Sequence, residues 1–179
     1  MREYERGRIR MNDETLFTHP WMGVLEPKVR DFLRQRGVLQ PRTVPIDTVR
    51  AELEGLGYHV HDSVRAVMAS MEGLHLRGLD HRHLKFDASA AADGIDGFCI
   101  PDVKRTLSDT ACPVATSDFA TFFVTADGGW WLLDEAWILY IRLKDFNDVI
   151  RLVCFGEQTV GTRVQLEGEQ IPPAYRRDT

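Results

Sequence analysis

The segment that most constrains the fold is a short polar turn between two apolar runs, residues 119–125 (FATFFVT) and residues 130–134 (WWLLD). The turn itself reads Ala126-Asp127-Gly128-Gly129. Aspartate and paired glycines supply the positive backbone φ angles of a tight hairpin turn, and the aromatic flanks favour strands. The sequence therefore predicts an antiparallel hairpin here, which needs a further layer of structure to cover its apolar side.

Four segments have the apolar spacing of amphipathic helices. In residues 24–36, Val29, Phe32 and Leu33 repeat at i, i+3 and i+4, and a proline lies in the first turn. The other three helices are predicted at 47–57, 63–73 and 146–156, and a shorter one at 101–107. Each of the four longer segments is followed closely by, or ends at, a glycine, which is typical of a helix C-terminus. Asp145 can cap the last long helix by accepting hydrogen bonds from its free amides.

Further strands are predicted from alternation at period two and from short apolar runs. Residues 74–76 and 84–86 read as two short strands around a polar turn. Two more are expected at 136–143 and 162–166. The intervening residues 87–98 are acidic, small and glycine-containing, and we expect a loop.

The order of these elements predicts the fold class. Helices come first, strands joined by short turns follow, and a helix closes the series, which favours α+β with N-terminal helices packed on a mainly antiparallel sheet and a C-terminal helix. Sheet strands alternating with long helices, as in a doubly wound fold, are absent from the pattern. We expect a polar tail over residues 1–20, a single domain over 21–166 and a second tail over 167–179.

The composition, 44% hydrophobic and 27% charged, is that of a folded globular chain. No apolar run approaches the roughly 20 residues that a transmembrane helix needs, and the N-terminal stretch MREYERGRIRMNDE lacks a secretory apolar core. The three cysteines, Cys99, Cys112 and Cys154, are widely spaced and have apolar or proline neighbours. We therefore expect a cytoplasmic protein with buried free thiols, no membrane contact and no disulfide framework.

The acidic excess of the chain is concentrated in one segment. The formal net charge is −5, while residues 87–135 hold two basic and nine acidic residues, a net charge of −7. A negative field there disfavours nucleic acid as a partner and favours a basic protein, whose approach it accelerates. The alternative is that the acidity serves solubility alone.

No catalytic or cofactor motif is present. The sequence contains no HExxH, P-loop, GxSxG or dinucleotide fingerprint. On a strand, His81 and His83 would point to the same side and could share a metal, but a lone HxH is more typical of a polar surface. Asp134 and Glu135 are adjacent, so on a strand they point to opposite faces. We expect no catalytic residues, no metal and no cofactor.

Two adjacent tryptophans, Trp130 and Trp131, follow the predicted turn. On one strand, one ring should face the core and the other should face outward, where a tryptophan often marks a binding surface. The alternative is that helices or a tail cover both faces of the sheet.

Several motifs, in order, are similar to those of the SUKH superfamily, in particular its third subfamily. The linker GVLQPRTV at residues 37–44 stands where that family has "AGW-PGR-V", and Met71-Glu72-Gly73-Leu74 stands where it has "FGGL". Cys112-Pro113-Val114-Ala115 occupies the place of its "P-I-G", before a hairpin and a terminal helix. The resemblance spans about residues 28–156; the linker lacks the family's tryptophan, and Glu72 and Ala115 replace glycines.

The resemblance implies an immunity protein of a bacterial polymorphic toxin system. Members of the family are thought to bind a cognate toxin domain, often a basic nuclease or nucleic-acid-modifying enzyme, and to block it. Two alternatives remain open: a small metal-dependent hydrolase using the region of His81 and His83, and a regulatory scaffold of the same fold that binds a host protein.

The acidic segment and the two tryptophans contain the candidate partner-binding residues. We expect acidic side chains to speed encounter with a basic toxin and an outward-facing tryptophan to slow dissociation. The candidates are Asp93, Asp96, Asp118, Asp127, Trp130 and Trp131.

Overall fold

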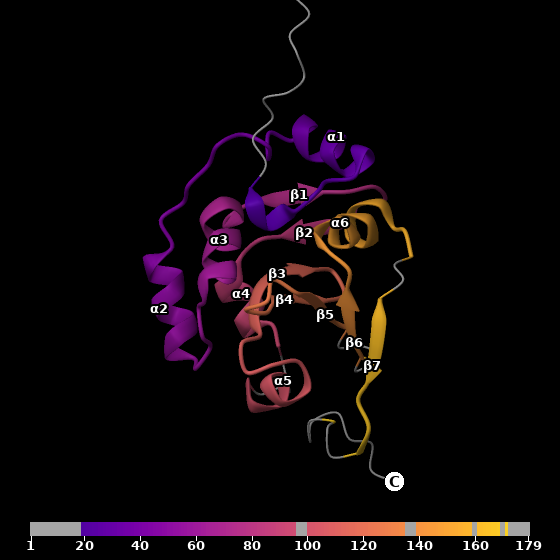
Figure 1. The fold of residues 1–179 in the computed structure, drawn as a ribbon. Coiled ribbons are helices and arrows are strands. Elements are labelled where there is room, and N and C mark those ends of the chain that lie inside the picture. The colour runs from indigo at the N-terminus through magenta and orange to yellow at the C-terminus, as the bar shows by residue number, and fades with distance from the viewer. Residues whose placement is uncertain (1–18, 96–99, 135–138, 159–160, 169–170, 172–179) are drawn as a thin grey trace, which may run out of the picture.

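The computed structural model describes residues 19–95, 100–134, 139–158, 161–168 and 171. Within them, seven antiparallel strands form one sheet in which neighbours in sequence are neighbours in space (Figure 1). The strands are β1 (His75–Arg77), β2 (His83–Lys85), β3 (Cys112–Ser117), β4 (Thr121–Val124), β5 (Trp130–Asp134), β6 (Leu139–Leu143) and β7 (Thr162–Gln165). The helices are η2 (Pro20–Met22), α1 (Pro27–Gln35), α2 (Asp47–Gly55), α3 (Asp62–Met71), α4 (Ala88–Asp93), α5 (Ile100–Thr106) and α6 (Phe146–Phe155). The expected α+β class is confirmed.

The predicted hairpin is formed by β4 and β5. The Asp127 carboxylate accepts hydrogen bonds from the Thr125 hydroxyl at 2.5 Å and from the Gly129 amide at 3.1 Å. Gly128 has a φ of 79°, a conformation that residues with a Cβ rarely adopt. The turn residues therefore set the register in which Val124 pairs with Trp130.

Two elements differ from the sequence-based expectation. Residues 87–98 were expected to form a loop, but Ala88–Asp93 is a helix whose first turn is capped by the Asp87 carboxylate, 2.9 Å from the Ala90 amide. Strand β3 is not predicted from the sequence, because its first four residues are buried without alternation and it contains Pro113. The strand register shifts between Pro113 and Ala115, so the proline lies at an irregularity, where a missing amide is tolerated.

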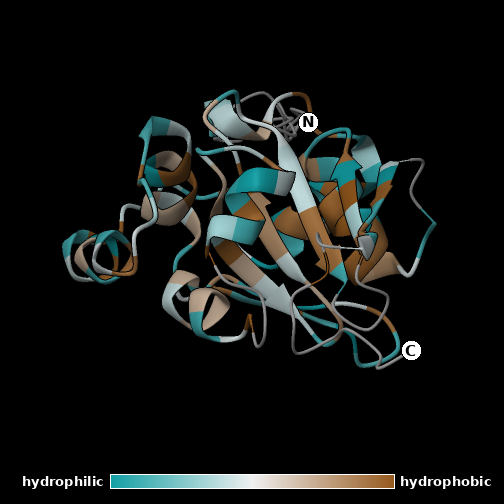
Figure 2. Ribbon diagram, turned by 90° about the horizontal axis from the view of Figure 1, so that it is seen from below, coloured by the Kyte–Doolittle hydropathy of each residue, from teal (hydrophilic) through white to brown (hydrophobic). Residues whose placement is uncertain are grey.

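One face of the sheet is covered by η2, α1, α3 and α6, as Figure 1 shows. At its centre, Trp21, Trp130 and Phe146 form an aromatic cluster with ring centroids 4.9–5.9 Å apart. Figure 2 shows hydrophobic residues concentrated on the central strands, while the outer turns of the helices are largely hydrophilic. Burial of the apolar helix stripes against this face is the main force that holds the helices in place.

The opposite face of the sheet is covered in part by a smaller cluster. Phe123, Leu133 and Tyr140 project from the strands on this side and are fully buried. Val103 of α5 packs over them, and Leu166, just after β7, joins the same cluster. Short segments thus shield part of the second face of the sheet as well.

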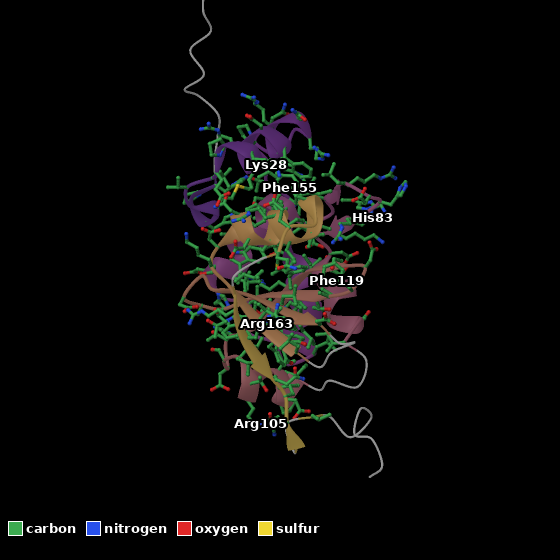
Figure 3. All side chains as sticks on the ribbon, turned by 90° about the vertical axis from the view of Figure 1, so that its right-hand side faces the viewer. Lys28, His83, Arg105, Phe119, Phe155 and Arg163 are labelled. Atoms are coloured by element: carbon green, nitrogen blue, oxygen red, sulfur yellow. The ribbon has the colours of Figure 1, made fainter. Side chains whose placement is uncertain are left out.

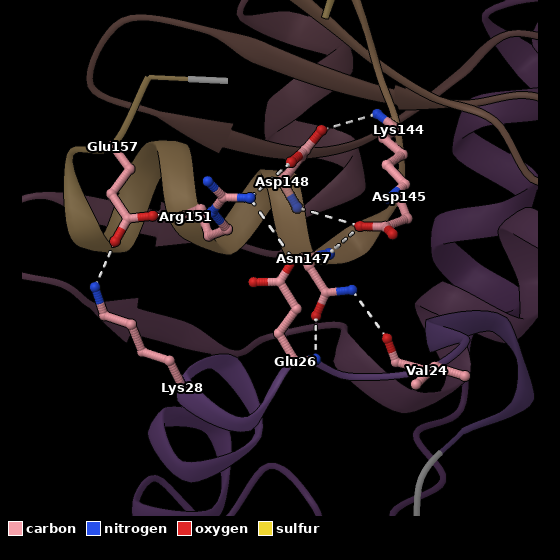
Figure 4. A network of polar contacts seen from close by, with 9 residues as sticks. All are labelled: Val24, Glu26, Lys28, Lys144, Asp145, Asn147, Asp148, Arg151 and Glu157. Atoms are coloured by element: carbon pink, nitrogen blue, oxygen red, sulfur yellow. Dashed lines mark hydrogen bonds and ion pairs between the residues drawn. The ribbon is translucent and has the colours of Figure 1, made fainter. Parts of the chain in front are cut away.

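Asn147 ties the N-terminal segment to the start of α6 (Figure 4). Its side-chain oxygen accepts a hydrogen bond from the Glu26 amide at 2.9 Å, and its side-chain nitrogen donates to the Val24 carbonyl at 3.0 Å. The predicted cap is confirmed in the same place, since Asp145 accepts from the Asn147 amide at 2.9 Å. Asn147 is only 2% exposed, so both of its contacts are shielded from water.

We expect Asn147→Ala to lower the free energy of unfolding by about 1–3 kcal/mol, because it leaves a backbone donor and a backbone acceptor without a partner. Urea unfolding measures this. Lys28→Ala is the matched control: it removes an exposed ion pair with Glu157 that joins the same two parts of the chain, and such pairs contribute about 0–1 kcal/mol. Equal losses in the two variants would contradict the role given to Asn147.

Candidate functional site

The two adjacent tryptophans have different environments. Trp130 is 3% exposed and belongs to the aromatic cluster beneath the helices, so it is a core residue and not a binding candidate. Trp131 lies on the opposite face, where it is partly buried at the margin of the smaller cluster. The two rings lie on opposite faces of the strand, as expected. Trp131 does not face fully outward, because the second face of the sheet is covered in part, and it remains the candidate anchor.

Trp131 lines a surface cleft of about 300 Å³, which we call the Trp131 cleft. Its walls come from the end of α5, the loop before β3, the β4–β5 turn and the neighbouring strand β6. The lining residues are Leu107, Ser108, Thr110, Thr125, Ala126, Asp127, Trp131 and Arg142. Apolar, hydroxyl and charged groups are therefore presented together, and they include an aromatic ring and an arginine, two side chains that are enriched at protein interfaces.

Hydrogen bonds join the walls of the cleft. The Ala126 amide donates to the Thr110 hydroxyl oxygen at 3.0 Å, and the Ser108 and Thr110 hydroxyls lie 2.9 Å apart. The Ser63 hydroxyl of α3 donates to the Ala126 carbonyl at 3.0 Å. These contacts hold the β4–β5 turn against two other elements, so the shape of the cleft is largely formed before any partner arrives.

Asp127 and Arg142 give the cleft its charge. The Arg142 guanidinium lies 3.5 Å from the Asp127 carboxylate and 5.7 Å from the centroid of the Trp131 ring. The hydrogen bond from Thr125, followed by that from the Gly129 amide, lowers the pKa of Asp127, so this carboxylate is ionised at neutral pH. Arg142 was not a candidate from the sequence; strand pairing places it directly opposite Trp131.

The candidate aspartates do not form one patch. Asp118 is exposed in the β3–β4 turn and Asp127 in the β4–β5 turn, which lie at opposite ends of β4. Asp93 is exposed at the end of α4, beside Glu52 and Leu56 of the α2 region. Asp96 lies outside the described residues. Successive hairpin turns alternate between the two ends of a sheet, so acidic residues that are close in sequence become separated in space.

Several acids of the segment 87–135 have local structural roles. Asp87 caps α4, and Asp102 forms an ion pair with Arg105 at 2.5 Å on α5. Asp127 forms an ion pair with Arg142. Local cations and helix amides thus neutralise part of the acidic excess counted from the sequence.

The described cysteines are not placed for nucleophilic chemistry. Cys112 and Cys154 are fully buried, and desolvation raises the pKa of each thiol to about 12. A protonated, inaccessible thiol is a poor nucleophile, which agrees with the expectation of buried thiols. Cys99 and Glu135 lie outside the described residues.

Glu72 has a shifted pKa, and the cause is the position of its carboxyl between two helices. Burial raises the pKa of this carboxyl to about 7, although it accepts a hydrogen bond from the Ala88 amide at 3.3 Å. The carboxyl lies where α3 ends and α4 begins, close to Arg42 and Asp87. It joins two helices at a position where the resembled family has glycine.

His81 and His83 do not lie side by side on one strand, which the alternative of a shared metal would require. His81 lies in the β1–β2 turn with a φ of 62°, while His83 begins β2 and contacts His75 across the hairpin. In the described parts of the chain, no three His, Cys, Asp or Glu side chains are gathered as a metal site would require. Nor is any helix in those parts long and apolar enough to cross a membrane.

Comparisons of the chain with protein-family models, curated proteins and solved structures found no match. The resemblance to the SUKH superfamily therefore rests on the order of its sequence motifs alone.

Proposed function

We propose that this chain is a cytoplasmic immunity protein that binds a cognate bacterial toxin domain and blocks it. The observation that carries the proposal is the Trp131 cleft, which a partly buried indole lines together with the Asp127–Arg142 ion pair and three hydroxyl-bearing residues. Tryptophan and arginine are the residues most enriched at the energetic centres of protein interfaces. A cleft held by hydrogen bonds loses little conformational entropy when a partner docks.

The order of elements supports the same proposal. In the resembled family a short helix, a linker and two further helices precede a hairpin and a terminal helix. Here α1, α2 and α3 precede the β4–β5 hairpin and α6, and a positive-φ glycine follows α3 at Gly73. The motif match and the element order agree along the chain.

Charge further favours a basic partner. Asp93 and Asp118 are exposed in the acidic segment, and no ion pair within the described residues neutralises either of them. Exposed carboxylates around a binding site raise the rate at which a cationic protein finds it. A toxin that handles nucleic acid is usually such a protein.

The proposal is tested by finding whether a neighbouring reading frame encodes a toxin domain, and by the survival of bacteria that express that domain. Cells that also express this chain should grow, and cells with an empty vector should not. The double variant His81→Ala with His83→Ala should protect as well as the wild type, because blocking a toxin by binding needs no histidine chemistry. If that variant folds and binds the toxin but fails to protect, the binding-only proposal is wrong.

A further inference from the structure

Two histidines face each other on the exposed side of the β1–β2 hairpin. In the strand register His75 pairs with Lys85 and Arg77 pairs with His83, so the two imidazoles are diagonal neighbours on one face. Leu76 and Leu84, between them on each strand, point into the core. The alternation of the strands therefore directs both imidazoles away from the core, and His83 lies at the edge of the molecule, above Phe119, in Figure 3.

The distance between the two imidazoles suits a shared metal ion. His75 Nε2 and His83 Nδ1 are 2.8 Å apart. Two nitrogens that each bind one ion at about 2.0 Å lie about 2.8 Å apart at a right angle and about 3.3 Å apart at a tetrahedral angle. The observed separation matches adjacent positions of an octahedral or square-planar site, and metal binding would rotate the rings so that both lone pairs meet at one ion.

We propose that His75 and His83 form a surface site for a late first-row divalent cation of the Ni²⁺ and Cu²⁺ type, with water completing the coordination. Without metal, one ring nitrogen donates a hydrogen bond to the other. When the ion binds, the donor ring carries its proton on its other nitrogen, so that both facing nitrogens can present a lone pair to the ion.

The surroundings of the pair fit this assignment. A hollow of about 40 Å³ beside His83, lined also by Lys85, Thr116, Ser117 and Asp118, has room for a metal-bound water.

The bound ion would cross-link the edge strand of the sheet to its neighbour. β1 has three residues and lies at the edge of the sheet. The Arg36 guanidinium donates a hydrogen bond to the Arg77 carbonyl of this strand at 2.9 Å. A bridge from His75 to His83 would fasten the same strand from its exposed side. The site is independent of the proposed function, since the β1–β2 hairpin contributes no residue to the Trp131 cleft.

Isothermal titration of NiCl₂ into the full chain without an affinity tag tests the proposal at neutral pH. We expect one ion per chain, and a loss of affinity of about ten-fold or more in His75→Gln and in His83→Gln, because each removes one of two protein ligands. His81→Gln, in the adjoining turn, should bind as the wild type does. NiCl₂ should raise the melting temperature of the wild type and of His81→Gln only.

Three outcomes would overturn the site: no binding by the wild type, unchanged binding by either His75→Gln or His83→Gln, or an equal loss in His81→Gln. The side chain of His75 is exposed and that of His83 is only partly buried. All three variants should therefore fold, and their melting temperatures without metal verify this.

Discussion

Replacing Phe146 by alanine should lower the free energy of unfolding by about 3–5 kcal/mol, the range for aromatic truncation in a packed core. Phe146 is 1% exposed at the start of α6 and contacts Trp21 and Trp130, with centroid distances of 4.9 and 5.4 Å. The truncation removes the ring that connects η2, α6 and β5, so the resulting cavity weakens the packing of all three elements. Chemical denaturation followed by tryptophan fluorescence measures the loss.

Phe119→Ala is the matched control for this prediction. Phe119 is 39% exposed in the β3–β4 turn, so its loss should change stability by no more than about 0.5 kcal/mol. If both phenylalanine variants unfold at the same denaturant concentration, the assignment of the main core to the aromatic cluster is wrong.

The parts of the fold that sequence reasoning predicted are those specified locally. Asp127, Gly128 and Gly129 are enough to predict the β4–β5 turn. The Asp145 carboxylate is enough to predict the start of α6. The helix stripes were also visible, as with Val29, which is fully buried. Each of these signals lies within a few residues of the element it specifies.

The parts that were missed depend on tertiary context. Strand β3 is buried along most of its length, so it lacks the alternation that reveals a half-exposed strand. Helix α4 is a run of small residues with no apolar stripe, and the acids and glycines of residues 87–98 favour a loop. Tertiary packing against β3 and the Asp87 cap make this segment helical.

The candidate site could be predicted only in part for the same reason. The sequence pointed to Trp131 and Asp127 because they adjoin the turn. Arg142 joins them through the β5–β6 register, which pairs it with Trp131, and Thr110 joins through a hydrogen bond to the turn. The His75–His83 contact likewise follows from the β1–β2 register, whereas sequence spacing alone suggested His81.

The second large effect concerns the complex with the toxin domain. Trp131→Ala removes the indole from the cleft, and loss of an aromatic anchor at an interface centre costs about 2 kcal/mol or more, which is about 30-fold in affinity. The change should appear mainly as faster dissociation, because a short-range contact acts after the partners have met. Thermal unfolding of the variant alone verifies that the partly buried position tolerates alanine.

A variant with four aspartates changed to asparagine should show a lower association rate constant. The four are Asp93, Asp96, Asp118 and Asp127. Removing exposed negative charge should slow association with a basic toxin and flatten its dependence on salt. Because Asp118 and Asp127 lie at opposite ends of β4, the effect should come from the summed field rather than from one contact.

The dissociation rate of the toxin complex, measured by surface plasmon resonance for the wild type, Trp131→Ala and Phe119→Ala, tests the central claim most directly. The Trp131 cleft and Phe119 lie toward opposite ends of β4, so the two aromatic truncations probe different ends of the sheet. We expect dissociation about 30-fold faster for Trp131→Ala and unchanged for Phe119→Ala. Wild-type dissociation from Trp131→Ala, in a variant that remains folded, would contradict the account and place the interface elsewhere.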